Sequence, residues 1–160
     1  MILSIHALAG AALGSSIANP LESSVLALIS HYFIDSLPHF DYKVENLKEG
    51  NLKSDSIHPE FLKITVDLII SSAIIVFVIY KNPENILSIL MGSFFGLFPD
   101  GLILAHFIFE KNISNSFIGK LLLSHYEFHY KTHSKTYSVN AAAAIIQLIL
   151  MIFLMAVIFR

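Results

Sequence analysis

The sequence lacks cysteine altogether, and only 14% of its residues are charged. The absence of cysteine excludes disulfides, thiolate metal sites and cysteine nucleophiles, so nitrogen and oxygen atoms would have to hold any metal ion. The formal net charge is −2 and there is no basic block, which argues against nucleic-acid binding. Neither a G-x-S-x-G nor a G-x-x-x-x-G-K motif occurs, so serine-hydrolase and P-loop chemistry have no support.

Apolar residues make up 55% of the chain and the mean hydropathy is positive, which is typical of an integral membrane protein. A helix that crosses the hydrocarbon core needs about 20 mostly apolar residues. Residues 2–17 and 21–37 are shorter and richer in small residues, and predict a tight hairpin that either spans or re-enters the membrane. The sequence thus predicts an all-α bundle of about five helices in one domain, 1–160. The three stretches of full spanning length are 61–80, 84–108 and 138–159.

Two polar segments are expected outside the hydrocarbon core: a loop at 38–60 and an amphipathic helix at 114–134. If every predicted helix crosses, both segments lie on the side of the N-terminus. Every lysine except Lys81 lies on that side, so the positive-inside rule predicts a cytoplasmic N-terminus in a prokaryotic inner membrane. The first ten residues, "MILSIHALAG", have no positively charged n-region and are interpreted as a retained helix.

Two patterns bear on how the helices pack. Gly10 and Gly14, and likewise Gly92 and Gly96, are four residues apart, a spacing that allows close helix approach. The stretch "ANPLESSVLALISHYFIDSLPHFD" also resembles "KNPENILSILMGSFFGLFPDG". Each begins with Asn-Pro and ends with a proline followed by a possible metal ligand, as two related helical hairpins would.

Ionisable side chains converge on one face. All eight histidines fall in the half assigned to the cytoplasmic side. His31 and Asp35 are an i,i+4 pair on one helical face, which can chelate Zn²⁺ or a similar ion. Asp67 lies about one turn inside an apolar helix, where an unpaired carboxylate costs about 2.5–3.5 kcal/mol, so it is a functional candidate. Asp100 follows Pro99 where a broken or kinked helix is expected to present a ligand.

A row of histidines at four-residue spacing runs through "SHYEFHYKTHS". Because the row drifts around the helix by about 40° per step, two neighbours can share one ion but three cannot easily do so. We expect His129 to ligate with either His125 or His133. The full set of predicted metal ligands is His6, His31, Asp35, Asp67, Asp100, His125, His129 and His133.

The remaining polar residues have lesser predicted roles. His39 and Asp41 in "LPHFDY" are expected to orient ligating histidines or to contact substrate, and His58 and His106 are interpreted as non-functional. Structural alternatives stay open for the main candidates. His6 could bond a carbonyl, Asp35 could cap the following turn, and Asp67 could pair with a lysine one turn away.

The motifs "HALAGAALG", "SHYFIDSLPHFDY" and "GLFPDG", with Asp67 and the closing histidine row, resemble a family of small prokaryotic proteins labelled membrane-bound metal-dependent hydrolases. That family is distantly similar to zinc-dependent phospholipase C, a helical enzyme with a His/Asp trinuclear zinc cluster. The resemblance implies that His31-x-x-x-Asp35 matches the phospholipase His-x-x-x-Asp, and His129-x-x-x-His133 a late ligand pair. The phospholipase has His-x-x-x-Glu at that late position, and it is soluble and secreted.

Six or more nitrogen and oxygen ligands on one face suffice for two metal ions with an open coordination position, an arrangement that serves phosphoester hydrolysis. The sequence therefore predicts a hydrolase in which metal-bound hydroxide attacks a phospholipid or lipid-linked phosphate from the bilayer. Asp35 or Asp67 would serve as ligand or general base. Zinc is the favoured metal, with manganese or iron as alternatives and one to three ions. The competing functions are a metal-ion or proton transporter and a scaffold with a structural metal site.

Overall fold

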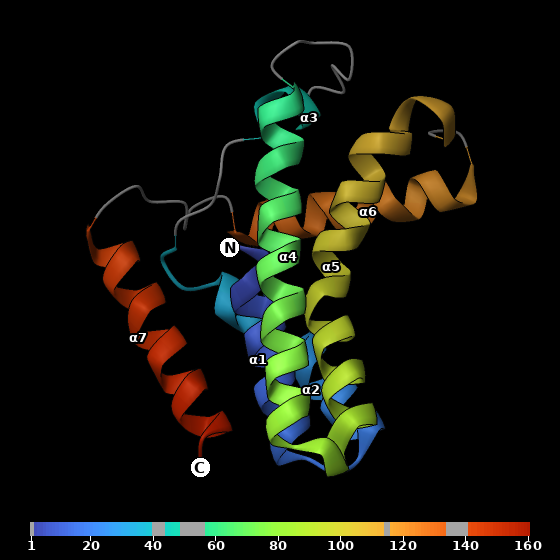
Figure 1. Cartoon of the computed structure of the whole chain (residues 1–160). Helices are drawn as coiled ribbons and strands as arrows, with labels where there is room; N and C mark the ends of the chain where they lie inside the picture. Colours follow the sequence, from blue (N-terminus) through green and yellow to red (C-terminus); the bar gives the residue numbers. More distant parts are fainter. Residues whose placement is uncertain (1, 40–43, 49–56, 114–115, 134–140) are drawn as a thin grey trace.

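The computed structural model describes residues 2–39, 44–48, 57–113, 116–133 and 141–160. Helices dominate these residues, which confirms the all-α prediction (Figure 1). A short helix, α3, lies within the predicted polar loop, and α6 matches the predicted amphipathic segment. The elements in order are α1 (Leu3–Ser16), α2 (Pro20–Asp35), α3 (Glu45–Lys48), α4 (Ile57–Lys81), the 3-10 turn η1 (Pro83–Asn85), α5 (Ile86–Ile113), α6 (Phe117–His133) and α7 (Ala141–Ile158).

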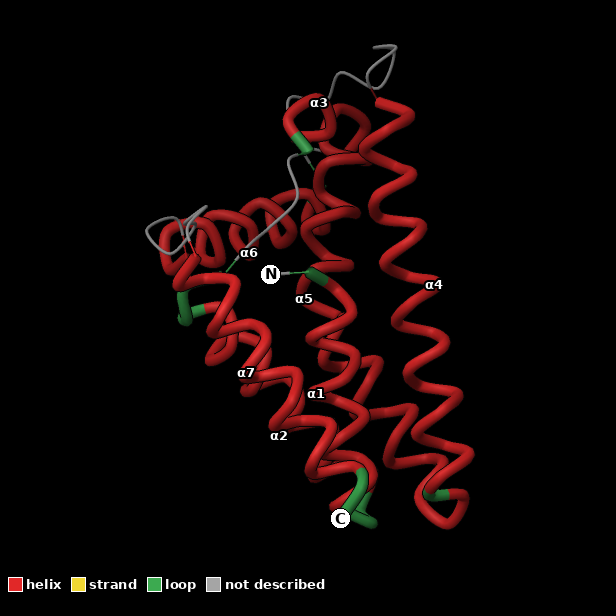
Figure 2. Tube along the Cα trace, turned by 60° about the vertical axis from the view of Figure 1, so that its left-hand side comes forward, coloured by secondary structure: helices red, strands yellow, loops and turns green. Residues whose placement is uncertain are grey.

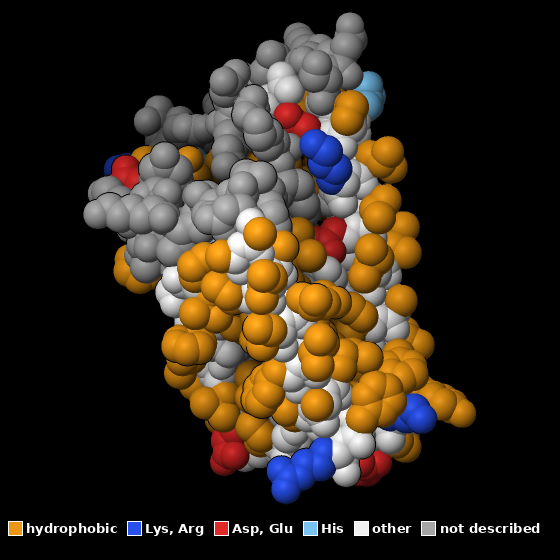
Figure 3. Space-filling view, turned by 90° about the vertical axis from the view of Figure 1, so that its left-hand side faces the viewer, with side chains coloured by type: hydrophobic (Ala, Val, Ile, Leu, Met, Phe, Trp, Pro, Cys, Tyr) orange, Lys and Arg blue, Asp and Glu red, His pale blue; other side chains and the backbone are white. Residues whose placement is uncertain are grey.

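Three helices are long and apolar enough to cross a membrane, and they match the three predicted spans: Ile57–Lys81, Pro83–Phe109 and Ala141–Ile158. Figure 3 shows hydrophobic side chains over much of the lower part of one face, with charged side chains along its lower edge and also in its upper part. With 14 and 16 residues, α1 and α2 are shorter than these helices, as expected, and are not among the candidate spans.

Helix α1 runs through the centre of the molecule and is enclosed by α2, α4, α5 and α7. All its residues from Ser4 to Ala12 are buried, and most of them are alanine, glycine or leucine, which leaves room for neighbours on every side. Helix α2 differs from the prediction of a buried hairpin, because one of its faces stays exposed. That apolar face carries Leu21, Val25, Ile29 and Phe33.

The glycines of α1 and α5 meet, as their spacing predicted. A Cβ on Gly10 would collide with the backbone of Gly92, and one on Gly14 would collide with the backbone of Ser88. The two helices therefore pack backbone to backbone, which is possible only where side chains are absent.

The two Asn-Pro sequences begin helical segments at the same end of the bundle, but by different contacts. Asn19 Oδ1 accepts from the backbone N–H groups of Leu21 and Glu22 and caps α2. Asn82 makes no such cap, and its side-chain amide instead donates to the carbonyl of Val78. The similarity of the two segments thus extends to their position and not to their capping.

Helix α5 continues through Pro99 to Ile113, so of the two predicted alternatives, a broken or a kinked helix, the break is wrong. Pro99 removes one hydrogen bond, to the carbonyl of Phe95, and packing against α1, α2 and α6 holds the helix on both sides of that gap. Helix α6 lies crosswise to α4 and α5 in both views (Figures 1 and 2).

We predict that Gly10→Ala destabilises the protein by about 2 kcal/mol, because its Cβ has to displace the α5 backbone. Gly101→Ala is the matched control, since a Cβ there meets no atom within 4 Å. Alanine is favoured over glycine inside a helix by about 0.5–1 kcal/mol, so the control should be neutral or more stable. Unfolding in detergent measures both, and equal stability of the two variants would contradict the contact.

Candidate metal centre

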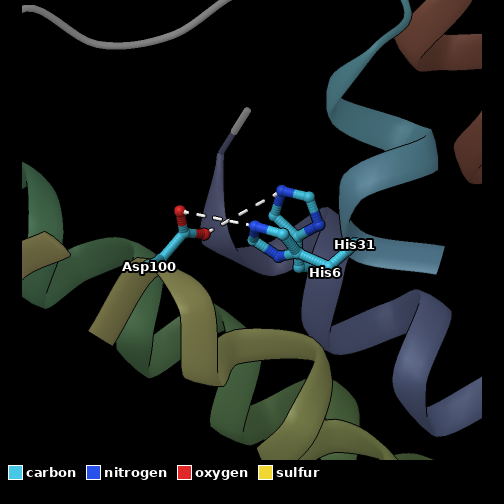
Figure 4. A group of neighbouring side chains, drawn as sticks. All are labelled: His6, His31 and Asp100. Atoms are coloured by element: carbon cyan, nitrogen blue, oxygen red, sulfur yellow. Dashed lines mark ion pairs between the residues drawn. The ribbon is translucent and has the colours of Figure 1, made fainter. Parts of the chain in front are cut away.

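Four side chains from three helices meet near one end of α1. His6 comes from α1, His31 and Asp35 from α2, and Asp100 from α5. His6 Nε2 lies 3.0 Å from Asp35 Oδ1, and His31 Nε2 lies 3.4 Å from Asp35 Oδ2. Both imidazoles also lie 3.9 Å from an oxygen of Asp100 (Figure 4). The convergence predicted from sequence is thus real for these four residues.

The cluster is largely buried, and Asp100 is its most exposed member. The imidazole rings of His6 and His31 stack with their centroids 4.1 Å apart. The side chains of His6 and His31 are fully buried and that of Asp35 nearly so, whereas the Asp100 side chain is 18% exposed. Asp100 therefore lines the side from which a ligand could approach.

A backbone hydrogen bond fixes the orientation of His31. Its Nδ1 lies 2.8 Å from the carbonyl oxygen of Gly96, and because a carbonyl only accepts, Nδ1 carries the proton. In neutral imidazole Nε2 then presents its lone pair, which faces the carboxylates of Asp35 and Asp100. Such an arrangement is favourable only if Nε2 is also protonated or a metal ion lies between the nitrogen and the carboxylates. Metal-ligating histidines commonly donate their other ring N–H to a carbonyl in this way.

The charge of the cluster leads to the same requirement. Asp35 and Asp100 together carry two negative charges when ionised, and buried charges are costly unless compensated. Two protonated histidines or one divalent cation would balance them. His6 Nδ1 is also buried and has no hydrogen-bond partner among the described residues. The buried His6 Nδ1 and the two carboxylates beside the imidazoles both fit a metal site.

The distances are close to those that a metal ion needs. One ligand atom from each of His6, His31 and Asp100 lies within 4.8 Å of the others. Ligands of a tetrahedral zinc at about 2.0–2.1 Å are roughly 3.3–3.4 Å apart. Small side-chain movements would bring the group to that geometry. The nitrogen and oxygen donors suit zinc, and manganese or iron as well.

Gly96 positions both histidines, a role that its sequence spacing did not reveal. Its carbonyl accepts from His31, and a Cβ on Gly96 would lie 2.8 Å from the carbonyl oxygen of His6. Its lack of a side chain lets the first turn of α1 approach α5 at the level of the cluster. The only sequence signal was the Gly92–Gly96 spacing, which pointed to packing.

Asp67 lies outside the cluster and bonds instead to the start of helix α1. Its Oδ2 accepts from the backbone N–H of Leu3 at 2.6 Å and its Oδ1 from that of Ser4 at 3.1 Å. The carboxylate of α4 therefore caps the N-terminus of α1, where the helix dipole favours a negative charge. Its contacts indicate a cap and not the predicted ligand or general base. It acts on the centre indirectly, by anchoring the turn that carries His6.

The other predicted site residues lie outside the cluster or outside the described residues. His125 Nε2 is 3.3 Å from the carbonyl of Pro99, so this ring donates to the turn before Asp100 and is not in the metal-ligating group. His39 is buried and donates from Nδ1 to the carbonyl of Leu37. The side chains of His129, His133 and Asp41 lie outside the described residues, so their roles stay predictions.

The two histidines interpreted as non-functional lie outside the cluster. His58 is exposed in the first turn of α4, and His106 is buried with its ring stacked on Tyr126. His58 therefore supplies a control for substitutions at the centre.

No protein-family model, no characterised protein and no solved structure matches this chain. The resemblance to membrane-bound metal-dependent hydrolases therefore stays a prediction, and the side-chain arrangement is the basis for assigning a function.

We predict that the purified protein binds a divalent metal ion and that Asp100→Asn and His31→Ala each lower its content at least several-fold. Asp100→Asn preserves side-chain shape and is the milder change. His58→Ala should retain the wild-type content. Elemental analysis in detergent measures this, and unchanged metal in Asp100→Asn would exclude Asp100 as a ligand.

For Asp67 we expect the reverse: a loss of stability without a loss of bound metal. Asp67→Ala should destabilise the protein by about 1–2 kcal/mol through loss of the α1 cap, and should keep its metal in the folded fraction. Thermal unfolding beside elemental analysis tests both. A folded Asp67→Ala variant without metal would indicate that Asp67 is a metal ligand after all.

Proposed function

We propose that this protein is a membrane-embedded hydrolase that uses a divalent metal ion, zinc in the first instance, to cleave phosphoesters. One observation carries the proposal: two imidazoles and two carboxylates converge from three helices, with Asp100 on the exposed side. Catalytic zinc sites combine three protein ligands with one open position, and His6, His31 and Asp100 could supply three such ligands.

A divalent metal ion held here would polarise a phosphoryl oxygen and would lower the pKa of its bound water to about 7. The side chains would divide the remaining work. His31, held by Gly96, and His6 supply nitrogen ligands. Asp35 approaches one nitrogen of each ring, with Oδ1 toward His6 and Oδ2 toward His31, and so orients both. Asp100, at the open side, is the carboxylate best placed to ligate and to accept a proton from the attacking water. In this proposal Asp100 takes the role that the sequence suggested for Asp67.

The packing beside the cluster supports a one-sided site over a transport path. One turn along α1 from His6, Gly10 meets the α5 backbone and leaves no space between the two helices. A transporter would need a route past this contact. The exposure of Asp100 also favours a site open to substrate over a closed structural metal site.

The centre lies near the start of α1, partway along α4 and α5 and on the side toward helices α3 and α6 (Figure 1). The lysine distribution supports placing the start of α1 at the cytoplasmic side of a prokaryotic inner membrane. A phosphoester would then reach Asp100 from the cytoplasm or from the inner leaflet.

We predict metal-dependent hydrolysis of a soluble diester, bis-p-nitrophenyl phosphate, by detergent-purified protein. EDTA should abolish the activity and zinc or manganese should restore it. Asp100→Asn should lose at least 100-fold in kcat, the range expected for removal of a catalytic acid–base group, while His58→Ala should remain active.

Release of p-nitrophenolate measures the rate. Activity that persists after metal removal, or metal-loaded protein inactive on this diester and on phospholipid vesicles alike, would reject the hydrolase. Metal uptake by proteoliposomes containing such inactive protein would establish the transporter instead.

A further inference from the structure

Helix α6 has three distinct faces. Leu122 and Tyr126 pack against the end of the bundle. A second face is apolar and exposed. A third is polar and exposed. The apolar face carries Phe117, Ile118, Leu121 and Phe128, which are 59–82% exposed, and the polar face carries Lys120, Ser124 and Glu127.

This pattern is unlike that of an ordinary surface helix, which has one buried face and otherwise polar surface. Four large apolar side chains in water would be unfavourable, and a helix wholly inside the hydrocarbon core would not carry Lys120 and Glu127. A helix that lies in the membrane–water interface satisfies both faces at once.

The orientation of α6 agrees with such a position. It lies crosswise to α4 and α5, two of the helices long and apolar enough to span, and so runs close to the membrane plane (Figures 1 and 2). It also lies at about the level where α1 and α7 begin (Figure 1).

Two contacts tie α6 to the metal centre. His125 donates to the carbonyl of Pro99, directly before Asp100. Phe128 packs edge-on against Tyr32, which is next to His31. The depth of α6 in a bilayer therefore sets the depth of the centre.

We propose that the apolar face of α6 inserts into the boundary between lipid headgroups and acyl chains, with Lys120 and Glu127 toward water. The partner of this surface is the bilayer itself. The open side of the metal centre then lies at the level of the lipid phosphates. This inference depends on the apolar helices and on α6, and holds whether or not the centre is catalytic.

The sequence contains no cysteine, so single cysteines can be introduced without background labelling. We would attach nitroxides at Ile118→Cys and Leu121→Cys, with Lys120→Cys and Ser124→Cys as controls on the same turns. The full chain is reconstituted in vesicles of phosphatidylethanolamine and phosphatidylglycerol. Collision rates are measured with oxygen, which concentrates in lipid, and with a water-soluble nickel chelate. We expect the ratio of oxygen to nickel collisions to be at least several-fold higher at 118 and 121 than at 120 and 124.

Two outcomes would overturn the proposal. Nickel-dominated collisions at all four positions would place α6 in water. Protection of 118 and 121 from both reagents, with spin–spin broadening between labels, would show that a second copy of the chain covers the face.

A second measurement covers the case in which a labelled variant misfolds. The chain also lacks tryptophan, so Phe117→Trp and Lys120→Trp each place a single fluorophore on α6. Lipids brominated near the headgroup should quench Phe117→Trp at least twofold more than Lys120→Trp, and equal quenching would contradict the insertion.

Discussion

Between Gly10 of α1 and Gly92 of α5 the two helix backbones touch, because neither residue has a side chain to separate them. Glycine inside a helix costs about 0.5–1 kcal/mol relative to alanine, and this chain accepts that cost four times along one contact. The same contact ends at Gly96, where the α5 backbone meets the turn of His6 and accepts a hydrogen bond from His31. Close packing of two apolar helices thereby sets the geometry of a polar centre.

Inside an apolar bundle every polar group needs a partner, and this requirement explains where the carboxylates lie. Asp67 is satisfied by the free N–H groups at the start of α1. Asp35 and Asp100 lie beside the imidazoles of His6 and His31, which can share a proton or a metal ion with them. A buried aspartate can thus cap a helix or take part in binding a cation, and the groups around it determine which.

Much of the fold followed from local patterns. The long apolar stretches predicted α4, α5 and α7, because hydropathy over about 20 residues reports the thickness of the bilayer directly. The four-residue glycine spacing predicted that helices could approach closely, though not which pair, and the i,i+4 spacing predicted that His31 and Asp35 share a face. Where several long-range contacts competed with a local signal, sequence reasoning failed. Pro99 indicated a break in α5, but packing on both sides of it keeps the helix continuous.

By itself the sequence determined the helical class, the candidate spans and the pool of His and Asp residues at one end of the bundle, since these depend on composition and on spacing along one helix. Only the tertiary structure decided which members of that pool meet. It joined His6, His31, Asp35 and Asp100, assigned Asp67 to the α1 terminus and turned His125 toward a backbone carbonyl. The reason is physical. A metal-ligating group requires atoms from separate helices within about 3–4 Å of each other, and the distance between helices is set by how their surfaces pack.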